Sequence, residues 1–283
     1  MLERIVHLNG VVTWQSPLLN RIRVRHAFST RIGGLSAGPF CSLNLGNPGD
    51  NTVQDTPQKL RENYQRLQQA IGCPPETLRA WVKQVHGRHV ELISAEPENE
   101  YAETIEAEIR DRFSGQCSAD AMVTSTPNVL LTIRTADCVP ILLASLDGAL
   151  VAAVHAGWRG IVGGVIAKTI RTLHETGCPA DQLTAAIGPA ISGEYFEVGE
   201  EVASEFYRQN LSAAVLPVSA TRAKPHIDLL VAARAQLHSA GIPAGQIDTN
   251  TLCTFRDAGD FFSHRRDNGL TGRLAAVIMA RAG

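Results

Sequence analysis

Cys138 and His155 are the residues whose types and spacing first suggest chemistry, because they flank the most apolar part of the chain. The dipeptide Asp147-Gly148 between them separates two apolar runs, a pattern typical of a β-hairpin with a two-residue type I′ turn. In that register the two side chains are diagonal neighbours on one face, with Cβ atoms about 7 Å apart or somewhat less. A thiolate and an imidazole so placed can bind one metal ion.

The same register gives both residues specific partners across the hairpin, with Pro140 opposite His155 and Gly157 opposite Cys138. Pro140 lacks a backbone donor and predicts an edge or a bulge near the site. Gly157 predicts open space over the sulfur. A shift of one residue would place Cys138 and His155 on opposite faces, so the predicted site depends on the register.

A third ligand is expected from the segment KQVHG, where His86 occupies a tight turn and His89 is the competing choice. A Cys/His/His set with one open position is typical of catalytic zinc. Copper fits less well, because a blue-copper site needs a weak axial ligand, usually Met, and the chain has three Met residues and no His-x-His pair. The residues also allow a cysteine hydrolase or amidase with Cys138 as nucleophile and His155 as its base.

Two loops near the N-terminus are candidates for binding phosphate. The segment FSTRIGG presents Arg31 beside two glycines, so a guanidinium and backbone N–H groups could hold the anion together. Asn44 in SLNLG could donate a hydrogen bond to phosphate or to a ribose. Both residues are therefore predicted to bind substrate.

Other polar and aromatic residues near the hairpin are expected to have structural roles. By strand alternation Asp137 should point away from the face of Cys138 and act as a structural acid. Arg159 and Arg265 are predicted to be surface arginines, and Trp158 is predicted to pack under the turn.

These residues need a scaffold of strands and helices, and the sequence predicts a mixed one. Helical spacing of apolar residues predicts helices at 58–71, 161–177, 200–210 and 229–241. Further strands are predicted at 78–85 and 89–94, joined by the turn HGR, at 183–191, and near the C-terminus. The charged residues 97–112 predict a surface helix or a loop. Because no regular βαβ alternation appears, we predict an α+β fold, a single domain over 1–283 with mixed β-sheets flanked by helices.

The composition describes an ordinary globular protein and narrows its partners. Of 283 residues, 44% are hydrophobic and 19% are charged, and the formal net charge is −2. The absence of a basic tract predicts no binding to nucleic acid or to a membrane surface. The six cysteines include no CxxC pair, which argues against a disulfide scaffold and a four-cysteine zinc site. With no signal peptide or membrane span recognised, we expect a cytoplasmic protein, and the sequence leaves its oligomeric state open.

Seven ordered motifs between Phe28 and Arg273 resemble one known family. They are FSTRIGG, SLNLG, KQVHG, TADCVP, VHAGWRG, IGPAI with FEVG, and CTF followed by FFSHRRD and TGR. The chain resembles the YfiH-type laccase-domain proteins, also called the multicopper polyphenol oxidase family or peptidoglycan-editing factors, and described as purine nucleoside phosphorylases. Two positions depart from the family pattern: His264 replaces a Tyr in FFSYRRD, and Tyr64 replaces the Arg of an Asn-Arg pair.

The resemblance implies a zinc ion held by His86, Cys138 and His155, the same three residues to which the hairpin register points. It implies phosphorolysis of adenosine, inosine and S-methyl-5′-thioadenosine to a free base and a sugar 1-phosphate, with small-molecule nucleosides and phosphate as partners. It also implies deamination of adenosine to inosine, which needs the acidified water that zinc provides. In this interpretation Cys138, His155 and Arg31 are the catalytic residues. A copper-dependent polyphenol oxidase and a non-catalytic partner of cell-wall or division proteins are alternatives.

Overall fold

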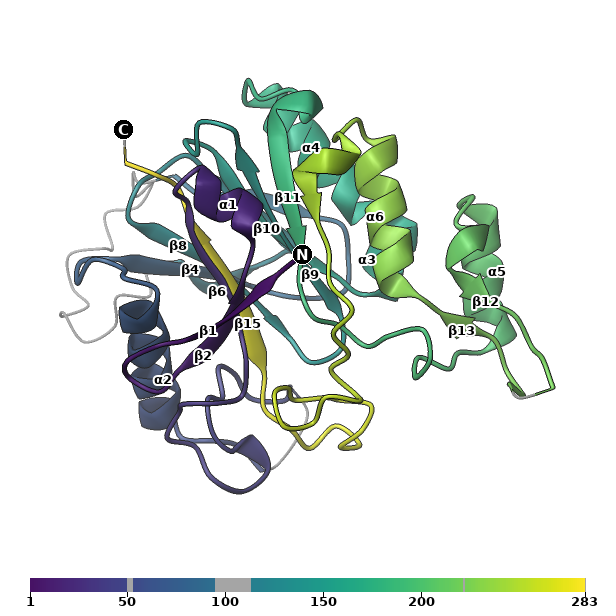
Figure 1. The fold of residues 1–283 in the computed structure, drawn as a ribbon, viewed down its shortest axis with the longest axis horizontal. Helices are drawn as coiled ribbons and strands as arrows, with labels where there is room; N and C mark the ends of the chain where they lie inside the picture. The colour runs from purple at the N-terminus through teal and green to yellow at the C-terminus, as the bar shows by residue number, and fades with distance from the viewer. Residues whose placement is uncertain (50–52, 95–112, 221, 283) are drawn as a thin grey trace.

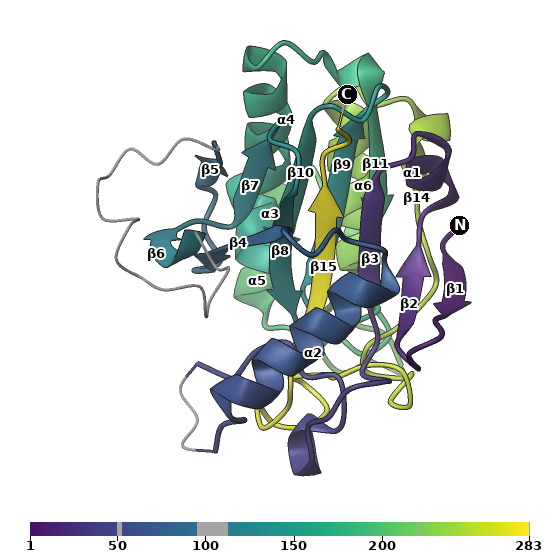
Figure 2. The same ribbon diagram turned by 90° about the vertical axis from the view of Figure 1, so that its left-hand side faces the viewer.

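The computed structural model describes residues 1–49, 53–94, 113–220 and 222–282, which form two large β-sheets between layers of helices (Figure 1, Figure 2). The strands are β1 (Glu3–Val6), β2 (Val12–Gln15), β3 (Arg25–Ser29), β4 (Leu78–Lys83), β5 (Val90–Leu92), β6 (Phe113–Ser118), β7 (Ala121–Thr124), β8 (Val129–Thr135), β9 (Val139–Ser145), β10 (Val151–Ala156), β11 (Leu183–Ile187), β12 (Val215–Leu216), β13 (His226–Ile227), β14 (Ile247–Asp248) and β15 (Leu274–Met279). The helices are α1 (Pro17–Arg21), α2 (Pro57–Ala70), α3 (Trp158–Gly163), α4 (Val165–Glu175), α5 (Glu200–Arg208) and α6 (Leu229–Ser239).

The two large sheets are both mixed. Sheet A has the strand order β1-β2-β3-β15-β8-β4-β6, and sheet B has the order β14-β11-β9-β10-β7-β5. Most neighbours are antiparallel, but β4 runs parallel to β6 and β8, β5 to β7, and β11 to β14. Mixed sheets flanked by helices confirm the predicted α+β fold class.

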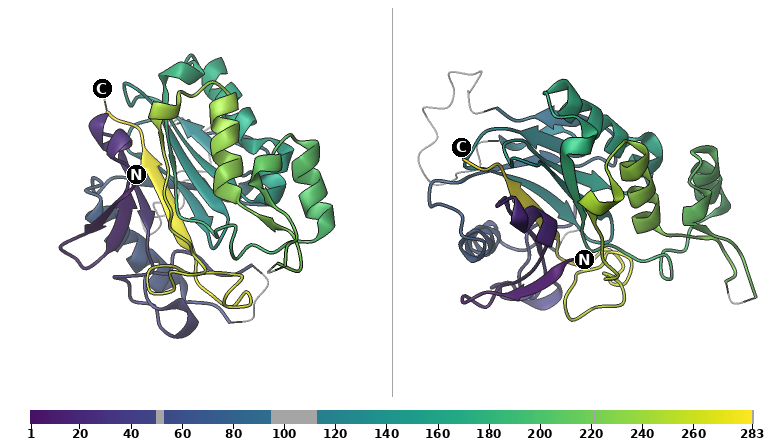
Figure 3. Two further views of the ribbon diagram at one scale, coloured as in Figure 1. Left: turned by 45° about the vertical axis from the view of Figure 1, so that its right-hand side comes forward. Right: turned by 45° about the horizontal axis from the view of Figure 1, so that its top comes forward.

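Among the described residues the apolar side chains form four clusters, and the three largest lie between four layers of structure. Sheets A and B pack face to face through residues such as Ile133 and Leu142. The outer face of sheet B is covered by α3, α4 and α6, which bury residues such as Leu173 and Leu237 (Figure 1, Figure 3). Helix α2 lies across the outer face of sheet A and buries Leu67 there (Figure 2). Strands covered on both faces become continuous apolar runs, which explains the sequence of β9 and β10.

The hairpin register predicted from the sequence is confirmed. Val151 pairs with Ala144, and His155 pairs with Pro140, in the antiparallel ladder of β9 and β10. Cys138 directly precedes β9 and therefore lies at the same end of the hairpin as His155.

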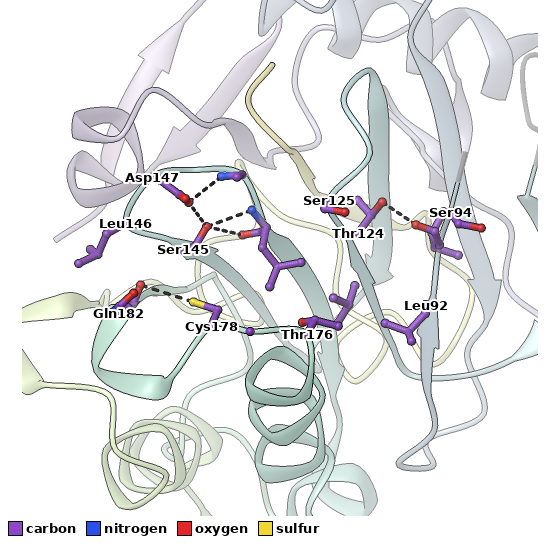
Figure 4. A pocket seen from close by; sticks show the side chains of 15 residues that line it. Leu92, Ser94, Thr124, Ser125, Ser145, Leu146, Asp147, Thr176, Cys178 and Gln182 are labelled. Carbon is purple, nitrogen blue, oxygen red and sulfur yellow. Dashed lines mark hydrogen bonds between the residues drawn. The ribbon is translucent and has the colours of Figure 1, made fainter. Parts of the chain in front are cut away.

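The predicted type I′ turn is wrong, because the connection is a four-residue loop. The Ser145 N–H donates to the Leu150 carbonyl across 2.9 Å and closes the loop over residues 146–149. Gly148 has a φ of 74°, whereas Asp147 is not among the residues with positive φ, and a type I′ turn needs positive φ at both. The Asp147 carboxylate instead accepts hydrogen bonds from Ala149 N–H and the Ser145 hydroxyl (Figure 4). Both loops are centred on the same peptide bond, so the register is unchanged.

Two further predictions need correction. The strands β4 and β5 belong to different sheets, so residues 84–89 carry the chain from sheet A to sheet B and do not close a hairpin. The helix predicted over 161–177 is two helices, because Gly164, with a φ of 81°, ends α3 and begins α4. The other three predicted helices are confirmed as α2, α5 and α6. The prediction for residues 97–112 lies outside the described residues.

Within the described parts of the chain, every helix is too short or too polar to span a membrane. The prediction of a single domain over residues 1–283 stays a prediction; the shared core between the two sheets supports it.

Candidate functional site

The structure brings His86, Cys138 and His155 together. Their potential ligand atoms all lie within 4.8 Å of one another, and the two imidazole rings meet edge to face with centroids 4.9 Å apart. Cys138 and His155 come from the β9–β10 hairpin of sheet B, whereas His86 comes from the connection between the sheets. The three side chains are therefore placed to bind one ion, and metal binding by them stays a prediction.

Gly157 allows this close approach. An added Cβ would lie 2.9 Å from Cδ2 of His86, closer than real Cβ contacts, and 3.0 Å from Sγ of Cys138, closer than most of them. The space predicted over the sulfur is therefore filled by the His86 ring. The backbone of Gly157 is ordinary, with a φ of −71°, so a side chain there would be opposed by the neighbouring side-chain atoms and not by backbone strain.

Asp120, which no sequence motif singled out, holds two of the three candidate ligands. Its buried carboxylate accepts a 2.7 Å hydrogen bond from Nδ1–H of His155, which leaves Nε2 of that ring available to a metal. The same carboxylate accepts from the backbone N–H groups of His86 at 3.0 Å and Gly87 at 2.6 Å. These bonds hold His86 at a φ of 58°, which is uncommon for a residue other than glycine. The sequence feature that could have identified Asp120 is its position as an acidic residue directly before the apolar strand β7.

The charges of Cys138 and His155 are coupled. Burial disfavours the thiolate, but the charge and hydrogen bond of His155 outweigh it and lower the pKa of Cys138 to about 6. Burial also disfavours the imidazolium, but Cys138 and Asp120 raise the pKa of His155 to about 9. Both shifts favour a thiolate beside an imidazolium when no metal is bound. The thiolate is the form that binds metals and the form that acts as a nucleophile.

The three residues line a cavity of about 910 Å³ with a strongly cationic wall. Among the described residues that line it, the charged ones besides the histidines are Lys83, Arg134, Asp137, Arg159, Arg265 and Arg273. Its aromatic residues are Trp81, Trp158 and Phe196. Five cations against one carboxylate favour an anionic substrate, and the aromatic rings offer faces for a planar one.

Three residues near the hairpin for which the sequence predicted no site role also line the cavity. Arg159 and Arg265 are exposed, as predicted, and both line the cavity. The Arg159 guanidinium lies 4.3 Å from the ring centroid of Trp158, and that of Arg265 lies 5.1 Å from that of Phe196. Trp158 packs against the core as predicted, and it also lines the cavity.

Arg134 and Arg273 form the most confined cationic part of the cavity, and neither was identified from the sequence. Gly46 lets both approach the SLNLG loop, because an added Cβ there would lie 2.9 Å from Cδ of Arg134 and 3.4 Å from Cβ of Arg273. Burial and the charge of Arg134 lower the pKa of Arg273. An anion beside the two guanidinium groups would offset their repulsion.

Asn44 is fully buried and is not among the described residues that line the cavity. Its Oδ1 accepts hydrogen bonds from the backbone N–H groups of Arg273 at 2.9 Å and Gly46 at 3.2 Å. Asn44 therefore positions the backbone of Arg273. The prediction that the Asn44 side chain itself contacts substrate has no support from this geometry.

Arg31 also lies outside the set of described residues that line the cavity. Its guanidinium donates to the carbonyls of Cys41 at 2.8 Å and Ala258 at 3.1 Å, and it lies 4.6 Å from the ring centroid of Phe262. These contacts join two loops. The predicted catalytic and phosphate-binding role of Arg31 is untested, and its neighbours give it a structural one.

Asp137 has the contacts of a structural acid. Its carboxylate accepts from the Thr254 hydroxyl at 2.6 Å and from the Arg265 backbone N–H at 2.7 Å. It thereby joins the start of β9 to two C-terminal loops, with a φ of 99° at Asp137 itself. Of the two departures from the family pattern, His264 lines the cavity, whereas the Tyr64 hydroxyl donates to the carbonyl of Leu45 in the core.

A second cavity, of about 580 Å³, lies at the far end of the same hairpin (Figure 4). It is surrounded by apolar and hydroxyl side chains, and Asp147 is the only charged one among the described residues that line it. Its described lining residues offer no group of potential metal ligands like that in the larger cavity, which is the better candidate for chemistry.

The fold and the site together define an α+β protein with mixed sheets and a Cys/His/His cluster in a cationic pocket. Residues 25–281 match the family described as multi-copper polyphenol oxidoreductase laccase, and the chain belongs to this family. The match confirms the resemblance found in the ordered motifs.

Named relatives and solved structures cover almost the whole chain. Purine nucleoside phosphorylases of Deinococcus radiodurans and Pseudomonas aeruginosa are 39% and 38% identical to it, over 93% and 94% of this chain and 92% and 95% of theirs. The crystal structure of YlmD from Geobacillus stearothermophilus matches with a TM-score of 0.80 at 30% identity, covering 96% of this chain and 97% of that one. The Bacillus licheniformis protein YfiH matches with a TM-score of 0.82 at 28% identity, covering 98% and 99%.

Proposed function

We propose that this protein is a zinc-dependent purine nucleoside phosphorylase that also deaminates adenosine. The observation that carries the proposal is the meeting of the Cys/His/His cluster, five cationic side chains and three aromatic rings in one cavity. The names of its relatives support the phosphorylase part of the proposal. Its substrates would be adenosine, inosine and S-methyl-5′-thioadenosine with phosphate, and its location would be the cytoplasm.

Phosphate would bind beside Arg134 and Arg273. Their confined positive charge suits a dianion, and a guanidinium can donate two parallel hydrogen bonds to it. There the arginines would hold a phosphate oxygen for attack on the ribose C1′, while the bond from C1′ to the base breaks. Trp81 and Trp158 provide faces on which the purine can stack.

The donors of the trio fit zinc. A thiolate and two imidazoles are ligands that zinc accepts, and three protein ligands leave a position for substrate or water. Asp120 holds the His155 ring in the required tautomer and fixes the turn that carries His86. Bound to these residues, zinc would supply a Lewis acid and an acidified water, the chemistry that deamination needs.

One observation favours a second candidate, a cysteine hydrolase or amidase. The neighbouring His155 and His86 lower the pKa of Cys138 and favour its thiolate, and His155 beside it can return a proton to a leaving group. Metal dependence separates the two functions, because zinc bound to Cys138 would occupy the thiolate that a hydrolase needs.

The test is an assay of adenosine, inosine and S-methyl-5′-thioadenosine with and without phosphate, on protein whose metal content is measured. We expect free base only with phosphate, inosine from adenosine, loss of both after chelation, and recovery with zinc. Cys138→Ala should abolish activity, whereas Cys178→Ala, beside the second cavity, should retain it. Full activity after chelation, lost only in Cys138→Ala, would favour the hydrolase. Phenol oxidation raised by copper, with phosphorolysis at background, would favour a copper oxidase.

A further inference from the structure

A second group of potential metal ligands lies outside the large cavity. The ligand atoms of His89, Glu91 and Cys117 all lie within 4.8 Å of one another. The Glu91 carboxylate is shared by the other two, since its Oε2 is 3.2 Å from Nε2 of His89 and 3.0 Å from Sγ of Cys117. The three residues are absent from the described lining of the cavity that holds the first trio.

The backbone places these side chains together at the edge of both sheets. His89 and Glu91 are two residues apart in an extended segment that ends in β5, so they project from the same face. Cys117 lies near the end of β6, and β5 and β6 are the edge strands of sheets B and A (Figure 2). The His89 carbonyl accepts hydrogen bonds from Asp120 N–H at 3.0 Å and Ala121 N–H at 3.2 Å, which anchors the segment close to Cys117.

The group is open to solvent. The side chain of His89 is 60% exposed and that of Glu91 is 32% exposed. An exposed ion pair such as His89–Glu91 contributes little to the stability of the fold, about 1 kcal/mol at most. Stability of the fold therefore does not explain why these side chains lie together. A dissolved metal ion could reach all three side chains and keep water in a fourth position.

We propose that His89, Glu91 and Cys117 form a second divalent metal site, which takes zinc. Imidazole nitrogen, carboxylate oxygen and thiolate sulfur are all zinc ligands, whereas magnesium and calcium require oxygen ligands alone. The hydrogen bond to Glu91, with burial, raises the pKa of Cys117 to about 11, so the metal-free site holds a thiol. On binding, the sulfur–metal bond replaces the S–H bond and the proton leaves to solvent, with no change in oxidation state.

The site shares a chain segment with the first trio. The connection 84–89 carries His86 to one site and His89 to the other. The Asp120 carboxylate accepts a hydrogen bond from the His86 N–H, and the Asp120 N–H donates one to the His89 carbonyl. A metal at His89 would therefore restrain the connection that positions His86. The inference does not depend on phosphorolysis, because it concerns metal binding at different residues.

The test is a titration of the metal-free full chain with cobalt(II), whose bond to a thiolate gives a charge-transfer band in the near ultraviolet. We expect two equivalents to bind, each adding to the band, with the second weaker. Cys117→Ser should lose the part of the charge-transfer band that the more weakly bound cobalt ion adds. Cys138→Ser should lose the part that the more tightly bound ion adds. Cys73→Ser, at another half-buried cysteine, is the matched control and should keep both.

His89→Gln tests the same site without altering a cysteine. Because this side chain is largely exposed, the variant should fold, and the second equivalent should bind at least tenfold more weakly. Equilibrium dialysis with zinc should give about two ions per wild-type chain and about one in each variant of the second site. Metal binding that is unaffected by both Cys117→Ser and His89→Gln would overturn the proposal, even if phosphorolysis is found. A single equivalent that is lost in these variants and kept in Cys138→Ser would support the second site and count against the first trio.

Discussion

Gly157→Ala is the sharpest perturbation of the candidate metal centre. The backbone at this residue, with φ −71° and ψ 169°, suits alanine without strain, so the added methyl group acts only on its neighbours. It would lie 2.9 Å from Cδ2 of His86 and 3.0 Å from Sγ of Cys138. Since carbon atoms prefer separations of about 3.5 to 4.0 Å, the ring and the thiol must each withdraw by about half an ångström.

This displacement exceeds what a metal site tolerates. Ligand distances must lie within about 0.2 Å of their preferred values. We therefore expect Gly157→Ala to weaken zinc binding at least about tenfold, or about 1.4 kcal/mol, and to lower phosphorolysis at limiting zinc. Competition with a chromophoric chelator measures the affinity, and thermal unfolding of the metal-free protein shows whether the fold is intact.

Gly163→Ala is the matched control, since this glycine is exposed at the end of α3, the helix that Gly157 precedes, and an added Cβ would meet no atom within 4 Å. It should keep the zinc affinity of the wild type and gain up to about 1 kcal/mol of stability. If Gly157→Ala is folded and binds zinc within twofold of this control, His86 and Cys138 do not hold one ion.

Three further predictions concern orientation, the anion site and acid stability. Asp120→Asn should weaken zinc binding about 10- to 100-fold in calorimetric titrations, because it removes the carboxylate that orients His155. Arg273→Gln should raise the KM for phosphate at least about tenfold and that for nucleoside less, whereas Arg31→Gln should leave both within about twofold. Burial lowers the pKa of His26 to about 4 from 6.5. The unfolded chain then binds more protons between these values, so stability in urea unfolding should fall by up to about 3 kcal/mol as the pH drops from about 7 to 4, and less in His26→Gln.

Each of these predictions has an outcome that contradicts it. Unchanged zinc affinity in Asp120→Asn would mean that the carboxylate only braces the backbone. A larger rise in the KM for phosphate in Arg31→Gln than in Arg273→Gln would restore the anion role predicted for Arg31. An equal loss of stability in acid for the wild type and His26→Gln would assign that loss to other groups.

The predictions that the structure confirms were made from local patterns in the sequence. The hairpin register followed from two apolar runs around a short connection, and it survived the wrong turn type because both loops have the same centre. Helix α2 followed from apolar spacing that stopped at Gly72. These features depend on residues close together in the chain.

The missed features depend on contacts between distant segments. Asp120 acts on His155 across 35 residues, and the Asn44 side chain bonds to the backbone of Arg273 across 229. The crossing of residues 84–89 between sheets could not be inferred, because two consecutive strands more often pair with each other. Arg134 gave no signal within its own strand, since its role depends on the partner that the fold places beside it.

The crossing has a consequence for how the protein assembles. His86 follows a strand of sheet A, whereas Cys138 and His155 belong to sheet B, so the trio exists only after the two sheets have docked. An ion held by all three would act as a cross-link between the sheets and would bind the native state in preference to the unfolded chain. Zinc would then raise the melting temperature of the whole molecule.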